Sequence, residues 1–168
     1  MNGEYIRKMS VTDLKNAAEP FLKAAGLWDA KGPSLDKTIA LEHEKYKLLT
    51  DIPRLVDFFY KDVVFDPKAM EKVLKAPGVK GLLLDLADAL KDFTPFTDKA
   101  LEERIRGFCA SKGVKVGQVF HPLRVACTGR TEGPTLFLML EVMGVEMVVS
   151  RLKAAAALLG ASLPENTP

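Results

Sequence analysis

The sequence predicts an all-α fold, and three observations support this prediction. Apolar residues recur every three or four positions along nearly the whole chain of 168 residues, which is the spacing of one helix face. Capping residues and Gly or Pro breaks interrupt this spacing at short intervals. The alternation of a half-buried strand is nowhere convincing. We therefore expect about eight helices, joined by short connections and packed as hairpins.

Three helical segments are predicted in the first third of the chain. An apolar stripe covers residues 14–25, where Pro20 is placed to kink or divide the helix and Gly26 to stop it. The second segment covers residues 34–48 and begins with a serine cap. The third covers residues 51–60, with a proline that the first turn tolerates.

Three more helices are predicted in the middle of the chain. Residues 66–76 begin with Asp at the N-cap and Pro at the first helical position, which favours a short helix. Residues 81–93 carry leucine and alanine at helical intervals. Thr97 is placed to cap an amphipathic helix that Gly113 ends.

The last part of the chain is less uniform. Residues 114–128 contain β-branched valines, a glycine and a proline, so propensity allows a strand as well as a helix. A helix is expected to start at Gly133–Pro134 and to end at Gly144, and another covers residues 145–159. The polar tail, residues 161–168, is expected to be disordered.

An extended piece before Asp66 suggests an internal boundary. We expect an N-terminal helical subdomain of residues 1–66 and a C-terminal one of residues 67–168.

The cysteines and histidines do not predict a metal or catalytic site. Cys109 and Cys127 are expected to be small buried apolar residues, because two thiols with the scattered His43 and His121 do not have zinc-ligand spacing. His121 stands in a turn-like setting and is expected to be structural or exposed. The chain shows no disulfide framework, membrane span or secretion signal, so we expect a cytoplasmic protein without a membrane partner.

The charges are segregated along the chain. The formal net charge is +2, which by itself does not indicate a nucleic-acid partner. Between Arg104 and Arg130, however, there are six basic residues and no acid. This block is either a basic face that attracts phosphates or a solvated surface that happens to lack acids. The basic residues are Arg104, Arg106, Lys112, Lys115, Arg124 and Arg130.

One stretch of the chain resembles a known family. Residues 121–129, His-Pro-Leu-Arg-Val-Ala-Cys-Thr-Gly, and residues 132–137, Glu-Gly-Pro-Thr-Leu-Phe, are similar to the C-terminal part of bacterial glutamyl-tRNA synthetase. Residues 115–118, Gly144 and the first seven residues extend the resemblance over nearly the whole chain.

The resemblance implies a helical cage in two subdomains, the anticodon-binding region of a class I aminoacyl-tRNA synthetase. It implies a monomer that binds tRNA(Glu) rather than DNA, through bases that are splayed apart and that stack on guanidinium and apolar surfaces. The positions that the resemblance assigns to the anticodon are Lys45, Arg106, Arg124, Pro134 and Leu136. Gly133 is added because Gly133–Pro134 offers exposed backbone at a helix start, where amide and carbonyl groups are free to pair with a base edge. Leu136 has an equally good alternative as one more buried leucine.

Lys45 departs from the family pattern, which has an arginine that selects cytosine at the first anticodon base. Lysine keeps the charge but loses the two-pronged guanidinium. This leads to the hypothesis that the parent enzyme accepts tRNA(Gln) as well as tRNA(Glu).

The resemblance also implies that the catalytic domain, with its ATP and Mg²⁺, is missing here, so this chain is expected to be non-catalytic and to hold no cofactor. Lys8-Met9-Ser10 resembles the start of a synthetase catalytic loop, but the next two residues differ, and we interpret it as the approach to the first helix. The alternative function is a free-standing helical protein-interaction module or tRNA-binding paralogue. An enzyme in its own right is disfavoured because no nucleophile–base pair or phosphate loop is visible.

Overall fold

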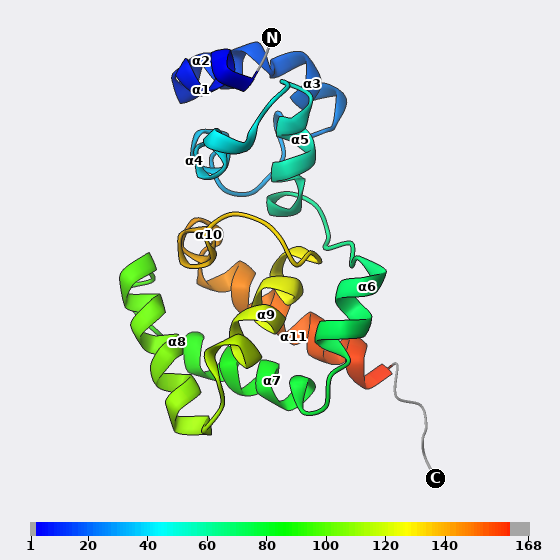
Figure 1. The fold of residues 1–168 in the computed structure, drawn as a ribbon, viewed down its shortest axis with the longest axis vertical. Helices are drawn as coiled ribbons and strands as arrows, with labels where there is room; N and C mark the ends of the chain where they lie inside the picture. The colour runs from blue at the N-terminus through cyan, green and yellow to red at the C-terminus, as the bar shows by residue number, and fades with distance from the viewer. Residues whose placement is uncertain (1–2, 162–168) are drawn as a thin grey trace. The chain divides into compact units, whose positions relative to one another are not determined.

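The computed structural model of the protein describes residues 3–161 (Figure 1). Every regular element among them is a helix or a helical turn, which confirms the predicted all-α fold. Most of the tail for which the sequence predicts disorder, residues 162–168, lies outside the described residues, as do residues 1–2.

The contacts within the chain define two compact units. Among the described residues, unit 1 comprises residues 3–62 together with 133–135, and unit 2 comprises residues 63–132 and 136–161. The predicted subdomains, with their boundary at Asp66, stay a prediction, because this division does not show that either part folds alone.

Unit 1 is built from short helices around a small core. The largest fully buried side chains in this core include Tyr46 and Phe59. Its elements are α1 (Gly3–Lys8), α2 (Val11–Ala17), α3 (Glu19–Ala24), α4 (Leu35–Leu41), the 3₁₀ turn η1 (His43–Lys45), α5 (Asp51–Val56) and the 3₁₀ turn η2 (Asp57–Phe59).

Two predictions for unit 1 have different outcomes. Pro20 does divide the first segment, since α2 ends before it and α3 begins with Pro20 in its first turn. The single helix over residues 34–48 is wrong, because α4 ends at Leu41 and the chain turns through η1. Tyr46 is fully buried, and its hydroxyl donates to the Ile39 carbonyl oxygen at 3.0 Å. Burial of this ring takes precedence over local helix propensity.

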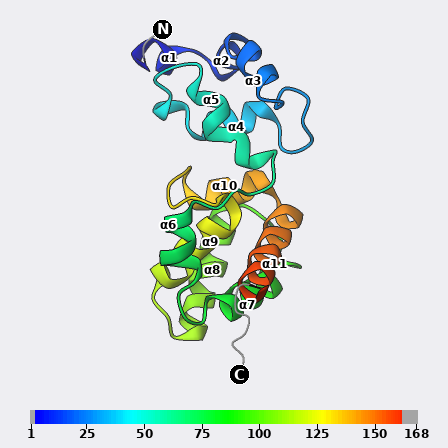
Figure 2. The same ribbon diagram turned by 90° about the vertical axis from the view of Figure 1, so that its right-hand side faces the viewer.

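Unit 2 contains the longer helices. Figure 2 shows α11 lying along α7, and α9 packs against α7, α8 and α11. The elements are α6 (Pro67–Ala69), the π-helical turn η3 (Met70–Leu74), α7 (Val79–Leu90), α8 (Asp98–Lys112), α9 (Val116–Thr128), α10 (Leu136–Met143) and α11 (Val145–Ala161).

The predicted helix ends in unit 2 follow local chemistry. The Asp66 carboxylate accepts from the Ala69 backbone N–H at 3.0 Å, as an N-cap should. Gly113 ends α8 with φ of 66°, in the left-handed region. Thr97 stands at the N-cap of α8 but makes no capping bond with its side chain, and Glu141 accepts from the Asp98 N–H instead, at 2.7 Å.

The ambiguous stretch 114–128 is helical from Val116 onwards. The Gln118 side chain accepts from the Lys115 N–H at 2.8 Å and so caps the start of α9. Pro122 is buried inside this helix. The turn-like setting predicted for His121 is therefore wrong, although its side chain is exposed as expected. α10 begins at Leu136, three residues later than predicted.

Candidate RNA interface

The start of segment 129–135, which joins α9 to α10, is fixed within unit 2. Gly129 has φ of 79°, and a Cβ there would collide with the Val64 carbonyl oxygen, so glycine is required by both conformation and space. The Asp66 N–H donates to the Gly129 carbonyl oxygen at 2.8 Å. An Arg151 guanidinium nitrogen donates to the Cys127 carbonyl oxygen at 2.7 Å at the end of α9.

The end of this segment belongs to unit 1. Lys45 Nζ donates to the Gly133 carbonyl oxygen at 3.0 Å and lies 2.8 Å from Glu42 Oε1. The Glu42 side chain is 2% exposed, whereas that of Lys45 is 57% exposed. The sequence predicts a free backbone at Gly133, but its carbonyl accepts this bond from Lys45. Pro134 is buried in the same unit.

Arg106 is held on α8 in unit 2. Its Nε donates to Glu102 Oε2 at 2.9 Å, one turn earlier on the helix. Its guanidinium lies 5.4 Å from the centre of the Phe120 ring, and that ring meets Phe137 edge-on at 5.3 Å. The guanidinium is thus oriented by one carboxylate and one ring, while the side chain stays about half exposed.

The other predicted positions in unit 2 are less accessible. Arg124 is partly buried on α9, and Leu136 is 7% exposed at the start of α10. Burial of Leu136 fits its alternative role as a core leucine. The predicted site residues therefore fall into two groups: Lys45, Gly133 and Pro134 in unit 1, and Arg106, Arg124 and Leu136 in unit 2.

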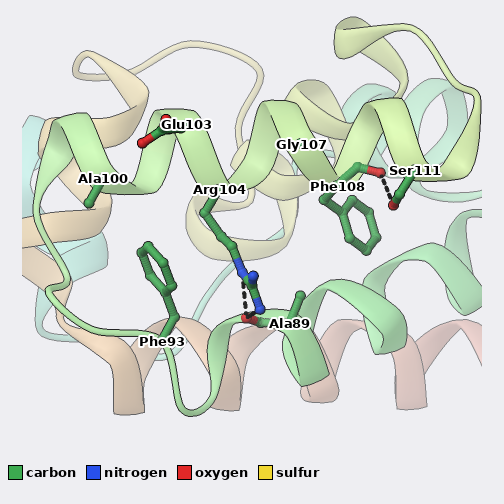
Figure 3. Close-up of a pocket in the computed structure, with 8 residues that line it drawn as sticks. All are labelled: Ala89, Phe93, Ala100, Glu103, Arg104, Gly107, Phe108 and Ser111. Atoms are coloured by element: carbon green, nitrogen blue, oxygen red, sulfur yellow. Dashed lines mark hydrogen bonds between the residues drawn. The ribbon is translucent and has the colours of Figure 1, made fainter.

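The acid-free block does not form one basic face. Arg104 and Arg106 have different partners: Arg106 contacts Glu102 and Phe120, whereas Arg104 donates twice to the Ala89 carbonyl oxygen, at 3.0 and 3.2 Å. Figure 3 shows Arg104 in the cleft between α7 and α8, with Phe93 beside it. Lys112 pairs with Asp85 at 2.6 Å. Acids outside the block thus pair with two of its basic residues, Arg106 and Lys112. A third, Arg104, donates to a backbone carbonyl oxygen.

The cysteines behave as the sequence predicts, since both are buried. Burial raises the pKa of the Cys127 thiol to about 12, although the nearby Arg151 and Arg124 favour the thiolate. Burial also raises the pKa of Cys109. Both cysteines are therefore uncharged thiols at neutral pH. They pack inside helices and are not nucleophiles. Within residues 3–161 no cluster of His, Cys, Asp and Glu is arranged to hold a metal ion, and no helix there could cross a membrane.

Sequence reasoning missed three side chains that fix the predicted contacts. Glu42 and Glu102 each lie within one helical turn of a basic residue, a spacing that the sequence shows but that is too common to single them out. Phe120 stands just before the family-like stretch, and nothing in its spacing shows that its ring lies under Arg106.

The fold and these two groups of residues define an all-α domain with exposed basic side chains fixed in place. Residues 13–156 match the family described as "Anticodon binding domain", and the chain belongs to this family.

Relatives of the chain include glutamate–tRNA ligases. The chain is 45% identical to that of Elusimicrobium minutum and 35% identical to that of Moorella thermoacetica, with 93% of this chain covered in each case. It spans about one third of their length, 32% and 33%. The solved structure of a glutamate tRNA ligase from Elizabethkingia meningosepticum matches with a TM-score of 0.81 and 26% identity, over 94% of this chain and 31% of that one.

Proposed function

We propose that this chain recognises the anticodon of tRNA(Glu) as the anticodon-binding part of a glutamate–tRNA ligase. The observation that carries the proposal is the family match over residues 13–156, in a chain whose relatives include glutamate–tRNA ligases. Attachment of glutamate, with its ATP and Mg²⁺, belongs in this proposal to a part of the ligase outside this chain. The chain's own contribution is binding, as a monomer in the cytoplasm, with no cofactor of its own.

The geometry of Arg106 supports this proposal. An unpaired base is recognised by stacking on planar groups and by hydrogen bonds to its edge. The Arg106 guanidinium is a planar group whose orientation is fixed by Glu102 and Phe120. Its two terminal nitrogens make no hydrogen bond to any described residue, so they are available to a base or a phosphate. Lys45 supplies a second exposed cation, in unit 1.

The proposal extends to tRNA(Gln). Lysine at position 45 offers a point charge in place of a two-pronged guanidinium, so we expect weak selection between cytosine and uracil at the first anticodon base. A preference of about tenfold or more, which corresponds to about 1.4 kcal/mol, would contradict this extension while leaving tRNA(Glu) binding intact.

The test is binding of a fluorescently labelled tRNA(Glu) anticodon stem-loop, measured by anisotropy. A matched stem-loop with the same stem and an unrelated anticodon is the control. We expect the tRNA(Glu) loop to bind at least about tenfold more tightly, and its log K to fall with log salt by about 0.7 for each phosphate contact. Equal affinity for the two loops would refute the proposed function.

A further inference from the structure

Glu42 is unusual in its burial. Among the described residues it is the one buried side chain of an acidic or basic type. Lys45 Nζ lies 2.8 Å from Oε1, in an alignment that is not that of a hydrogen bond. Oε2 has no hydrogen-bond partner among residues 3–161. A buried carboxylate with so few partners is costly, because it has lost water without full replacement.

Stability does not account for this arrangement. Replacing a buried ion pair by neutral groups of similar size is often neutral or stabilising. Burial and the nearby Glu42 raise the pKa of Tyr46, which is fully buried and whose hydroxyl is already bonded to the Ile39 carbonyl oxygen. A glutamine would fill the same space without the cost of a buried charge. The effect that a negative charge does have here is on Lys45, whose ammonium it holds beside the Gly133 carbonyl oxygen.

We propose that Glu42 is a positioning residue for RNA recognition, which fixes the Lys45 ammonium against segment 133–135 so that it meets one anticodon base in a defined place. This inference rests on the proposed function. A free lysine has a flexible four-carbon stem and loses its freedom when it binds. An ammonium already held by Glu42 and Gly133 has lost that freedom before RNA arrives, so more of the contact energy appears as base discrimination.

The arrangement compensates in part for lysine at this position. An arginine would hold a base through its rigid two-pronged geometry. Lys45 lacks that geometry, but two neighbouring groups set the position of its ammonium: the Glu42 carboxylate and the Gly133 carbonyl. Glu42 itself is too buried to touch RNA, so its effect on recognition passes through Lys45.

The experiment uses the full chain and a set of anticodon stem-loops. In each loop one of the three anticodon bases is exchanged, purine for pyrimidine or the reverse, and the discrimination ratio is the affinity for the tRNA(Glu) loop divided by that for the exchanged loop. The double variant E42Q/K45M removes both charges, so it leaves no unpaired buried carboxylate, and it identifies the base position that depends on Lys45. The test variant is E42Q, which keeps the size and shape of the side chain. The matched control is E19Q, which removes a charge from an exposed ion pair with Lys23 in the same unit.

We expect E42Q to lower the discrimination ratio about fivefold at the position identified by E42Q/K45M, and to leave the other two ratios unchanged. E19Q should change none of the three. A purely structural role for Glu42 would weaken binding of all the loops alike and leave the three ratios unchanged, because it would only reduce the folded fraction. Thermal unfolding of each variant confirms that binding is measured on folded protein.

The outcomes separate this inference from the proposed function. If the unaltered chain shows no anticodon preference, the proposed function fails. If it shows a preference but E42Q keeps all three ratios, or lowers them equally, the role of Glu42 is refuted and the function stands. If E42Q/K45M loses discrimination at no position, Lys45 does not contact a base and the inference is refuted as well.

Discussion

Lys45 in unit 1 and Arg106 in unit 2 are held in similar ways but in different surroundings. Each pairs with a glutamate within one turn, Glu42 at 2.8 Å and Glu102 at 2.9 Å. Glu42 is 2% exposed and Glu102 is 45% exposed. Water can therefore solvate Glu102 when Arg106 leaves, whereas Glu42 depends on Lys45 for compensation of its charge.

The second contact of each side chain also differs. Lys45 donates a hydrogen bond to the Gly133 carbonyl oxygen, whereas Arg106 lies over the Phe120 ring without a hydrogen bond to it. The local scaffold differs too, since Lys45 ends a 3₁₀ turn of three residues and Arg106 stands inside a helix of fifteen. The comparison indicates that Lys45 joins two segments of unit 1, whereas Arg106 contacts one helical turn and one ring in unit 2. In the proposed function, both side chains contact RNA.

The largest expected effect is a difference in the free energy of unfolding between variants of Lys45 and of Arg106. Lys45→Met leaves the buried Glu42 carboxylate without its cation, so we expect the free energy of unfolding to fall by about 2–3 kcal/mol. Arg106→Met breaks an exposed pair and should cost less than about 1 kcal/mol. Both are measured by urea unfolding, followed by far-UV circular dichroism and by the fluorescence of Trp28, which is the only tryptophan in the sequence and lies in unit 1.

The double variant E42Q/K45M is the control for this prediction. It should recover more than half of the lost stability, because the buried charge is gone together with its partner. Equal losses for Lys45→Met and Arg106→Met would show that burial of Glu42 does not distinguish the two pairs.

The two units also differ in how well their helix ends could be predicted from the sequence. Helix ends that depend on local chemistry were predictable, such as the Asp66 cap and the stop at Gly113. The helix over residues 34–48 was not, because its end depends on burial of Glu42 and Tyr46 in a core built from distant parts of the chain. Helical propensity for residues 42–48 is the weaker effect there.

The candidate site shows the same limit. Arg106 and Lys45 come from a family resemblance, and local spacing could at most suggest their glutamate partners. The Gly133 carbonyl that accepts from Lys45 is 88 residues away in the sequence, and no pattern places it there. The acid-free block 104–130 misleads for a related reason, since Lys112 finds its counter-charge on another helix, at Asp85.

The second prediction concerns RNA affinity. Arg106→Lys keeps the charge but loses the planar group over Phe120, so we expect affinity for the tRNA(Glu) stem-loop to fall about fivefold, or about 1 kcal/mol. The matched control is Arg104→Lys, the same exchange on the same helix, where the guanidinium already donates to the Ala89 carbonyl. That control should change affinity less than about twofold. If both exchanges weaken binding equally, the stacked geometry of Arg106 has no special part in recognition.

The smallest expected effect is a pH dependence of unit 1, in the segment that follows Lys45. Burial alone would raise the pKa of the Asp51 carboxyl, but the backbone N–H groups of Leu48 and Lys47, each at 3.0 Å, and the Arg54 guanidinium outweigh it and hold the pKa below its usual range. A lowered folded pKa contributes stability that is fully present above the unfolded Asp value, about 3.9, and is lost as pH falls through the folded pKa.

We therefore expect unit 1 to lose up to about 1 kcal/mol of stability as the pH falls from about 5 to 3, with this part of the loss absent in Asp51→Asn. The measurement is urea unfolding by Trp28 fluorescence at each pH. Asp36→Asn, which removes an exposed pair with Lys15 in the same unit, should leave the slope of stability against pH nearly unchanged. Arg106 stands in the middle of α8, where helical hydrogen bonds hold the backbone. An identical slope in Asp51→Asn and the unaltered chain would show that the segment after Lys45 is held without this carboxylate, and the contrast between the two scaffolds would then rest on Glu42 alone.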